Sequence, residues 1–165
     1  FRGIGNPIGL KVADPESCLR ILDVLDPQQE PGRVTLIHRF GADKIRERLP
    51  ALIRSVKASG RHVLWCCDPM HGNTRTTAAG IKTRHFGDIL NELEASFDVH
   101  GSEGTYLGGV HLELSGDDVT ECIGGASGIT ESDLARAYKS DVDPRLNYEQ
   151  ALEVAMLIAH RLRSS

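Results

Sequence analysis

The chain has 165 residues, of which 40% are hydrophobic and 25% charged, and its formal net charge is -4. These values predict a soluble globular protein and exclude a disordered chain. The acidic balance, without a dense Lys and Arg stripe, argues against nucleic-acid binding. No apolar run approaches the roughly 20 residues of a membrane span, and no signal peptide is recognisable. The start at Phe1 rather than Met suggests a processed or trimmed product.

Short runs rich in Val, Ile and Leu alternate along the chain with segments of helical periodicity. Strands are predicted at 6–12, 33–40, 62–69 and 108–114. Helices are predicted at 15–25, 42–60, 86–97, 130–138 and 148–162. Pro50 lies inside the second of these helices and is expected to kink or divide it. Thr130 and Asn147 are expected to cap the last two.

The spacing of the predicted strands, roughly 30 residues with a longer gap before the last, is typical of βα units with a parallel sheet. No glycine fingerprint follows the first strand, as a dinucleotide-binding fold would require. Polar residues instead gather near the carboxyl ends of the strands, where barrel enzymes build their sites. A full (β/α)8 barrel needs about eight strands and ~250 residues. We therefore predict an α/β half-barrel that forms one domain over residues 1–165.

The stretch HVLWCCDPMHGNT (62–74) has three interpretations: a redox pair, a metal site, or a buried strand followed by a polar turn. The four cysteines show neither a disulfide framework nor a CxxC spacing, which fits a reducing compartment. Cys66 and Cys67 are neighbours on a predicted strand, so their side chains should point to opposite faces rather than pair. The metal interpretation depends on other residues.

Four residues of metal-ligand type come from three different segments: His71, His111, Glu113 and Asp143. In the predicted fourth strand, period-two alternation puts His111 and Glu113 on one face. Polar groups buried there need each other, a metal or a ligand. Asp143 lies in an Asp-Pro turn, where aspartates commonly cap a helix. Arg145 is an alternative partner for it.

Basic residues also follow the predicted strands. Lys11 and Arg39 lie near the ends of adjacent strands, where two cations would converge on a phosphate or carboxylate. The alternative is that each pairs with a nearby acid. The loop at 72–86 could hold a second phosphate, although its charges could equally be solvated, and its basic residues are Arg75, Lys82, Arg84 and His85.

Six strings carry a resemblance to a known family: NPIGLKV, LIHRFG, WCCDPMHGNT, IKTRHF, GGVHLELSGDDVTECIGG and DPRLN. In this order and spacing they resemble the class II 3-deoxy-D-arabino-heptulosonate 7-phosphate (DAHP) synthases over nearly the whole chain. The resemblance implies a (β/α)8 barrel, of which this chain matches the C-terminal half, strands five to eight. It implies condensation of phosphoenolpyruvate with erythrose 4-phosphate, the first step of the shikimate pathway to aromatic amino acids.

The resemblance also assigns roles by motif. His71, Glu113 and Asp143 match the ligands of a divalent metal, which could be Mn²⁺, Co²⁺, Zn²⁺ or Fe²⁺. The predicted catalytic residues are Lys11, Arg39 and His71. The predicted substrate-binding residues are Lys11, Arg39, Lys82 and Arg84, the first two as phosphoenolpyruvate contacts. The family's fourth metal ligand, a cysteine, and further arginines lie in the N-terminal half and have no counterpart here.

The expected partners are the two substrates and the N-terminal half of the barrel, on the same chain or a separate one. A homo-oligomer in the cytoplasm is expected, or in a plastid if a transit peptide preceded the chain. One alternative is a relative that makes the amino analogue of DAHP in secondary metabolism. Another is a non-catalytic half-barrel that acts as an assembly or regulatory partner, because four βα units expose open sheet edges. A third, another metal-dependent barrel such as a hydrolase, rests only on His111 and Glu113.

Overall fold

The structure is a computed structural model that describes residues 1–163. A four-stranded parallel sheet forms its centre, with the strands in chain order: β1 (Ile8–Val12), β2 (Val34–His38), β3 (Leu64–Cys67) and β6 (Leu107–Val110). The α-helices are α1 (Pro15–Leu25), α2 (Ile45–Ala58), α3 (Phe86–Ser102) and α4 (Tyr148–Arg163). The prediction of an α/β protein with a parallel sheet is confirmed.

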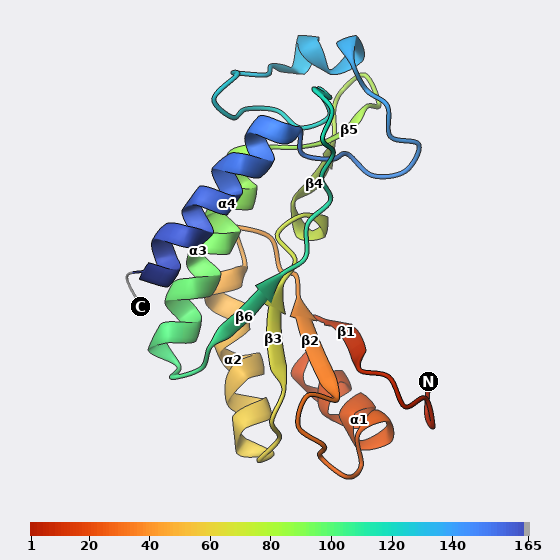
Figure 1. Cartoon of the computed structure of the whole chain (residues 1–165), viewed down its shortest axis with the longest axis vertical. Coiled ribbons are helices and arrows are strands. Elements are labelled where there is room, and N and C mark those ends of the chain that lie inside the picture. Colours follow the sequence, from red (N-terminus) through yellow and green to blue (C-terminus); the bar gives the residue numbers. More distant parts are fainter. Residues whose placement is uncertain (164–165) are drawn as a thin grey trace.

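The order of the strands determines where the helices lie. Every crossover steps in the same direction, and right-handed crossovers then place all helices on one face of the sheet. Consecutive helices accordingly pack against one another, α1 on α2, α2 on α3 and α3 on α4 (Figure 1). Leu36 on β2 faces this layer, where it is fully buried with Leu49 and Leu52 of α2. Lys11 and Ile37, each the fourth residue of its strand, face the opposite side.

Beyond one end of the sheet lie a hairpin and a long segment that joins β6 to α4 (Figure 1). The hairpin pairs β4 (Thr74–Thr76) with β5 (Lys82–Arg84). The segment contains a 3₁₀ helix at Glu131–Arg136, opened by a capping box of Thr130 and Asp133. A second 3₁₀ helix at His71–Asn73 follows β3. Among residues 1–163, no helix combines the length and hydropathy needed to cross a membrane.

The predicted elements need several corrections. The fourth strand ends at Val110 rather than 114, because its neighbour β3 ends at Cys67, just before Pro69, which has no N–H for further pairing. Helix α2 runs through Pro50 without a break, so the predicted division is wrong. The apolar face of α2 is fully buried and offsets the lost hydrogen bond.

Other elements differ in type or length. The segment predicted as a helix at 130–138 is the 3₁₀ helix already described. Helix α3 extends five residues beyond the predicted end at 97. The segment 72–86, predicted as a loop, contains the β4–β5 hairpin, whose two strands are polar and three residues long. The predicted cap of the last helix is confirmed, since Asn147 Oδ1 accepts a hydrogen bond from Gln150 N at 2.9 Å.

Candidate functional site

The predicted site residues come together at the carboxyl edge of the sheet. Lys11 lies on β1, Arg39 follows β2, Asp68 follows β3 and His111 follows β6. Because the four strands are parallel, these positions share one edge. The hairpin and the segment from β6 to α4 bring further polar side chains to it.

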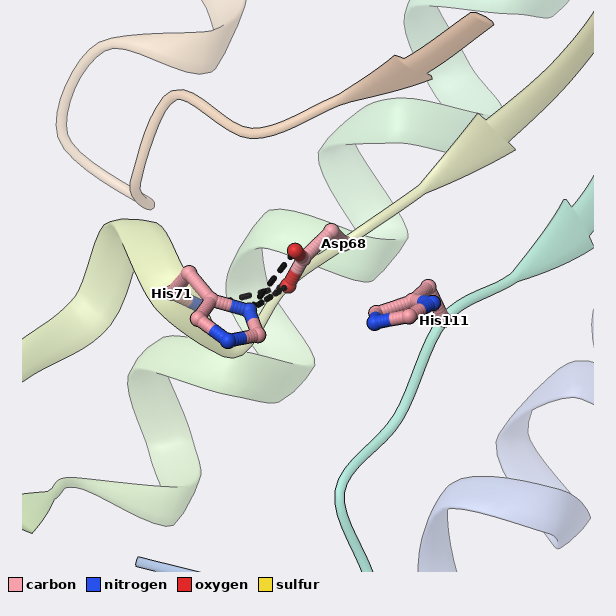
Figure 2. Close-up of side chains that lie close together, drawn as sticks. All are labelled: Asp68, His71 and His111. Atoms are coloured by element: carbon pink, nitrogen blue, oxygen red, sulfur yellow. Dashed lines mark hydrogen bonds and ion pairs between the residues drawn. The ribbon is translucent and has the colours of Figure 1, made fainter. Parts of the chain in front are cut away.

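Asp68 builds the turn that carries His71. Its carboxylate is fully buried, and Oδ1 accepts hydrogen bonds from the backbone N–H groups of Met70 and His71, both at 3.1 Å. The same carboxylate faces the imidazole, with His71 Nδ1 2.7 Å from Asp68 Oδ2 (Figure 2). Donation of the Nδ1 proton to Asp68 leaves a lone pair on Nε2. Asp68 therefore fixes both the position and the tautomer of His71.

The Nε2 side of His71 faces two carboxylates from distant parts of the chain. Nε2 lies 3.2 Å from Glu113 Oε1 and 4.0 Å from Asp143 Oδ2. One donor atom from each of the three residues lies within 4.8 Å of the other two, a spacing that a metal ion could occupy. The structure thus brings together His71, Glu113 and Asp143, the three residues predicted as ligands.

A second group of potential ligands consists of Asp68, His71 and His111. Figure 2 shows His111 apart from the bonded pair, on the segment after β6, and its ring centroid is 6.0 Å from that of His71. Lys11 Nζ lies 3.0 Å from Asp68 Oδ2. Burial raises the pKa of the Asp68 carboxyl, but the hydrogen bonds from His71 and Lys11 outweigh it and lower that pKa overall. Asp68 therefore already has Lys11 and His71 as partners, and His111 stands apart from both.

The β4–β5 hairpin delivers two cations to the carboxylates. Lys82 and Arg84 are two residues apart on β5, so both side chains point to the same side. Arg84 is fully buried and its Nη1 donates to Glu113 Oε2 at 2.7 Å. Its Nη2 has no hydrogen-bond partner among residues 1–163 and lies 3.9 Å from Asp143 Oδ1. Lys82 Nζ lies 2.5 Å from Asp143 Oδ1, and this contact lowers the pKa of the Asp143 carboxyl.

Arg145 does not pair with Asp143, so that alternative is wrong. Its guanidinium and backbone N–H instead donate to Glu121, which is fully buried. Glu121 also accepts the backbone N–H groups of Lys139 and Ser140, both at 2.9 Å. Glu121 thus holds both ends of the loop that presents Asp143.

The two cations predicted to bind an anion behave differently. Lys11 pairs with an acid, Asp68, as the alternative interpretation expected. Arg39 is exposed, and no hydrogen bond or ion pair joins it to any residue within 1–163. Of the other basic loop residues, Arg75 pairs with Asp88 at 2.9 Å and His85 is exposed.

The adjacent cysteines are part of the packing. All four cysteines are free and buried, which gives the redox-pair interpretation no support. Burial raises the pKa of the Cys66 thiol to about 11 and that of Cys67 well above its usual range. Neither belongs to a potential metal-binding group within the described residues. The opening stretch therefore combines a buried strand with a turn that carries His71.

The sequence does not identify two residues that support the site, Asp68 and Glu92. Asp68 stands between a strand and a proline, which is also the signature of an ordinary turn aspartate. Glu92, fully buried on α3, accepts hydrogen bonds from the loop after β2. Nothing in the helical pattern around Glu92 distinguishes it from a surface glutamate.

Comparisons with known proteins place these residues in context. A model of the class-II DAHP synthetase family matches residues 1–159. A phospho-2-dehydro-3-deoxyheptonate aldolase of Neurospora crassa is 55% identical over 99% of this chain and 35% of its own length. Proteins of that name from Mycolicibacterium smegmatis and Streptomyces coelicolor are 50% and 52% identical over 97% of this chain. The chain covers 35% and 36% of their respective lengths, so it spans about a third of these relatives.

Proposed function

The chain belongs to the class-II DAHP synthetase family, and on that premise we propose that it forms part of a DAHP synthase. The proposed reaction joins C3 of phosphoenolpyruvate to the aldehyde carbon of erythrose 4-phosphate, consumes water and releases inorganic phosphate. The observation that carries the proposal is the convergence of His71, Glu113 and Asp143 from three segments on one point.

The donor set fits a divalent metal. One imidazole nitrogen and two carboxylates suit Mn²⁺, Co²⁺, Zn²⁺ or Fe²⁺. Metal-bound histidines commonly donate their other ring N–H to a carboxylate, and buried Asp68 is placed to accept it from His71. A divalent ion held by these residues would supply Lewis-acid polarisation of the sugar aldehyde.

The chain's own cations have separate proposed tasks. Lys11 and Arg39, at the ends of adjacent strands, would bind the charged groups of phosphoenolpyruvate and turn its C3 toward the aldehyde. Arg39 is exposed and has no partner among residues 1–163, which leaves its guanidinium available for an anion. Lys82 and Arg84 would bind a substrate phosphate while also holding the carboxylates of Asp143 and Glu113.

We further propose that residues 1–165 form a single domain, strands five to eight of a (β/α)8 barrel. The strand order and the helices on one face of the sheet support this proposal. Both edge strands, β1 and β6, lack an outer neighbour in the four-stranded sheet within the described residues. An N-terminal half, on the same or a separate chain, would cover them. A homo-oligomer in the cytoplasm or a plastid completes the proposal.

We also propose two alternatives. An enzyme making the amino analogue of DAHP would use the same metal-binding and phosphoenolpyruvate-binding residues and differ in its sugar phosphate. A non-catalytic half-barrel that serves as an assembly or regulatory partner is favoured by the open edges of the sheet.

Phosphate release tests these proposals. The chain is incubated with phosphoenolpyruvate, erythrose 4-phosphate and Mn²⁺, alone and with the separately expressed N-terminal part of the Neurospora crassa relative. We expect phosphate release in the mixture that exceeds the sum of the two parts. Release with an amino sugar phosphate but not with erythrose 4-phosphate would favour the amino analogue. Absence of release with either substrate would contradict the catalytic proposal and favour the non-catalytic partner.

A further inference from the structure

The loop after β2 contacts the loop after β3 close to the candidate site. A Cβ atom on Gly72 would lie 2.4 Å from Gly41 N, and one on Gly41 would lie 2.8 Å from Gly72 O. Gly41 also has φ +83°, a conformation that favours glycine. Arg39 lies two residues before Gly41, and His71 immediately precedes Gly72. The contact therefore joins the loop of a proposed anion-binding residue to the turn of a proposed metal ligand.

A buried carboxylate from α3 bonds to both loops at this junction. Glu92 is fully buried, and its Oε1 accepts the backbone N–H groups of Phe40 at 2.8 Å and Gly41 at 2.9 Å. Its Oε2 accepts a hydrogen bond from Asn73 Nδ2 at 2.7 Å. Each carboxylate oxygen of Glu92 thus serves a different loop.

The orientation of the Asn73 amide is fixed by two further hydrogen bonds. Its Oδ1 accepts the backbone N–H of Ala42 at 3.0 Å, and its Nδ2 donates to the carbonyl oxygen of Pro69 at 2.8 Å. Rotation of the amide by half a turn would break both bonds. Asn73 can therefore only offer an N–H to Glu92, and an acceptor is required at that point.

We propose that Glu92, acting through Asn73, is a positioning residue that fixes the loop of Arg39 relative to the turn of His71. The inference rests on the proposed function, since it assigns Arg39 to phosphoenolpyruvate and His71 to the metal. Glu92 touches neither ligand. It determines how far apart their binding residues lie, because one carboxylate bonds to the backbone of the Arg39 loop and to the Asn73 side chain of the His71 turn.

Glu92→Gln should break the bond to Asn73 while it keeps the bonds to the Arg39 loop. A glutamine can keep its oxygen toward the N–H groups of Phe40 and Gly41, but its NH₂ group then faces Asn73 Nδ2, donor against donor. The His71 turn loses its bond to Glu92 but keeps those to Asp68, while the Arg39 loop keeps its bonds to residue 92. We expect Mn²⁺ binding to weaken by about tenfold, the lower end of the effect of outer-shell changes. Phosphoenolpyruvate affinity at saturating Mn²⁺ should remain within about twofold of the unmodified chain, since a retained contact contributes no new cost.

Glu92→Leu removes both acceptors and should weaken the binding of Mn²⁺ and of phosphoenolpyruvate together. Asp26→Asn is the matched control, because Asp26 is also buried and its Oδ1 accepts a loop N–H, that of Glu30 at 2.9 Å. Asp26 follows α1 and precedes β2, at the opposite end of the strands. Its change should leave both affinities unaltered.

Isothermal titration of the full chain with Mn²⁺, and then with phosphoenolpyruvate at saturating Mn²⁺, measures both effects, with circular dichroism to verify folding. Asn73→Ala is measured in parallel and should reproduce the Mn²⁺ loss even if Glu92→Gln does not fold. Unchanged Mn²⁺ binding in a folded Glu92→Gln or Asn73→Ala chain overturns this inference and leaves the proposed function standing. If the unmodified chain binds no Mn²⁺, the proposed function fails first and takes the inference with it.

Discussion

Two clusters of buried or half-buried imidazoles in this molecule show how neighbouring charges decide the role of a histidine. At the carboxyl edge, His71 donates to the buried carboxylate of Asp68 and faces Glu113 and Asp143. In the layer between the sheet and α3, His38 contacts both His100 and Ser96. Both of these rings are buried and neither is hydrogen-bonded to a carboxylate among residues 1–163.

The pKa values of His38 and His100 reflect the absence of a bonded carboxylate among residues 1–163. Burial, followed by the neighbouring His100, lowers the pKa of His38 to about 3, and burial lowers that of His100 to about 4. The core rings are therefore neutral packing groups at neutral pH. The edge ring is held by a carboxylate in the orientation that a metal ligand needs. The same residue type serves packing in one cluster and candidate chemistry in the other.

The largest expected effect separates the two groups of potential ligands at the edge. Glu113→Gln should weaken Mn²⁺ binding by more than about 100-fold, beyond the range caused by loss of an outer-shell partner. His111→Ala should leave Mn²⁺ binding within about twofold, because His111 is not one of the three proposed ligands. Isothermal titration measures both. The reverse order of effects would move the site to Asp68, His71 and His111.

The next effect concerns the carboxylate that orients the edge imidazole. Asp68→Asn replaces an acceptor by an amide that can also donate toward His71 Nδ1, and it removes the partner of Lys11. We expect Mn²⁺ affinity to fall by about 10- to 100-fold. Asp88→Asn, which breaks the ion pair with Arg75 on the hairpin, is the control and should have no such effect. Equal Mn²⁺ affinities for the two variants would show that Asp68 does not support the ligand.

A smaller effect tests the neutral core pair. In the unfolded chain both imidazoles become protonated near pH 6.5. In the folded chain they become protonated only near pH 3 for His38 and near pH 4 for His100. Stability is thus present above pH 6.5 and lost as the pH falls. Between pH 7 and 5 we expect a loss of about 1 to 2 kcal/mol per histidine in the free energy of unfolding.

Urea unfolding at pH 7 and pH 5 measures this loss. His100→Asn can keep a polar atom near Thr105 Oγ1, which lies 2.7 Å from His100 Nδ1, while it removes one titrating group. Between pH 7 and pH 5 the variant should lose about 1 to 2 kcal/mol less stability than the unmodified chain, because one titrating group is gone. The same acid sensitivity in both chains would mean that His100 is already protonated in the fold.

The sequence predicts most of the fold because the sheet obeys simple patterns. The four strands are apolar runs bounded by Gly or Pro, and α1 is predicted to the residue. The sequence does not predict the β4–β5 hairpin, because each of its strands consists of three polar residues. The strand predicted at 108–114 is too long, because its end depends on where β3 ends. The end of a strand is set by the strand beside it, and the sequence of one segment does not show which strand that is.

The candidate ligands were assigned from the resemblance rather than from spacing. His71, Glu113 and Asp143 are far apart in the chain, and HxE alone is equally a polar pair. The supporting residues were harder still. Asp68 looks like a turn residue and Glu92 like a surface glutamate, because their partners come from other loops. Only the folded structure places the acceptor beside its donors.

The central claim is that His71, Glu113 and Asp143 hold one divalent cation. Anomalous diffraction at the manganese absorption edge, from crystals of the chain grown with Mn²⁺, tests it directly. We predict a single strong peak within bonding distance of His71 Nε2 and of carboxylate oxygens of Glu113 and Asp143. A peak bonded instead by Asp68 and His111, or no peak near these three side chains at saturating Mn²⁺, would contradict the account.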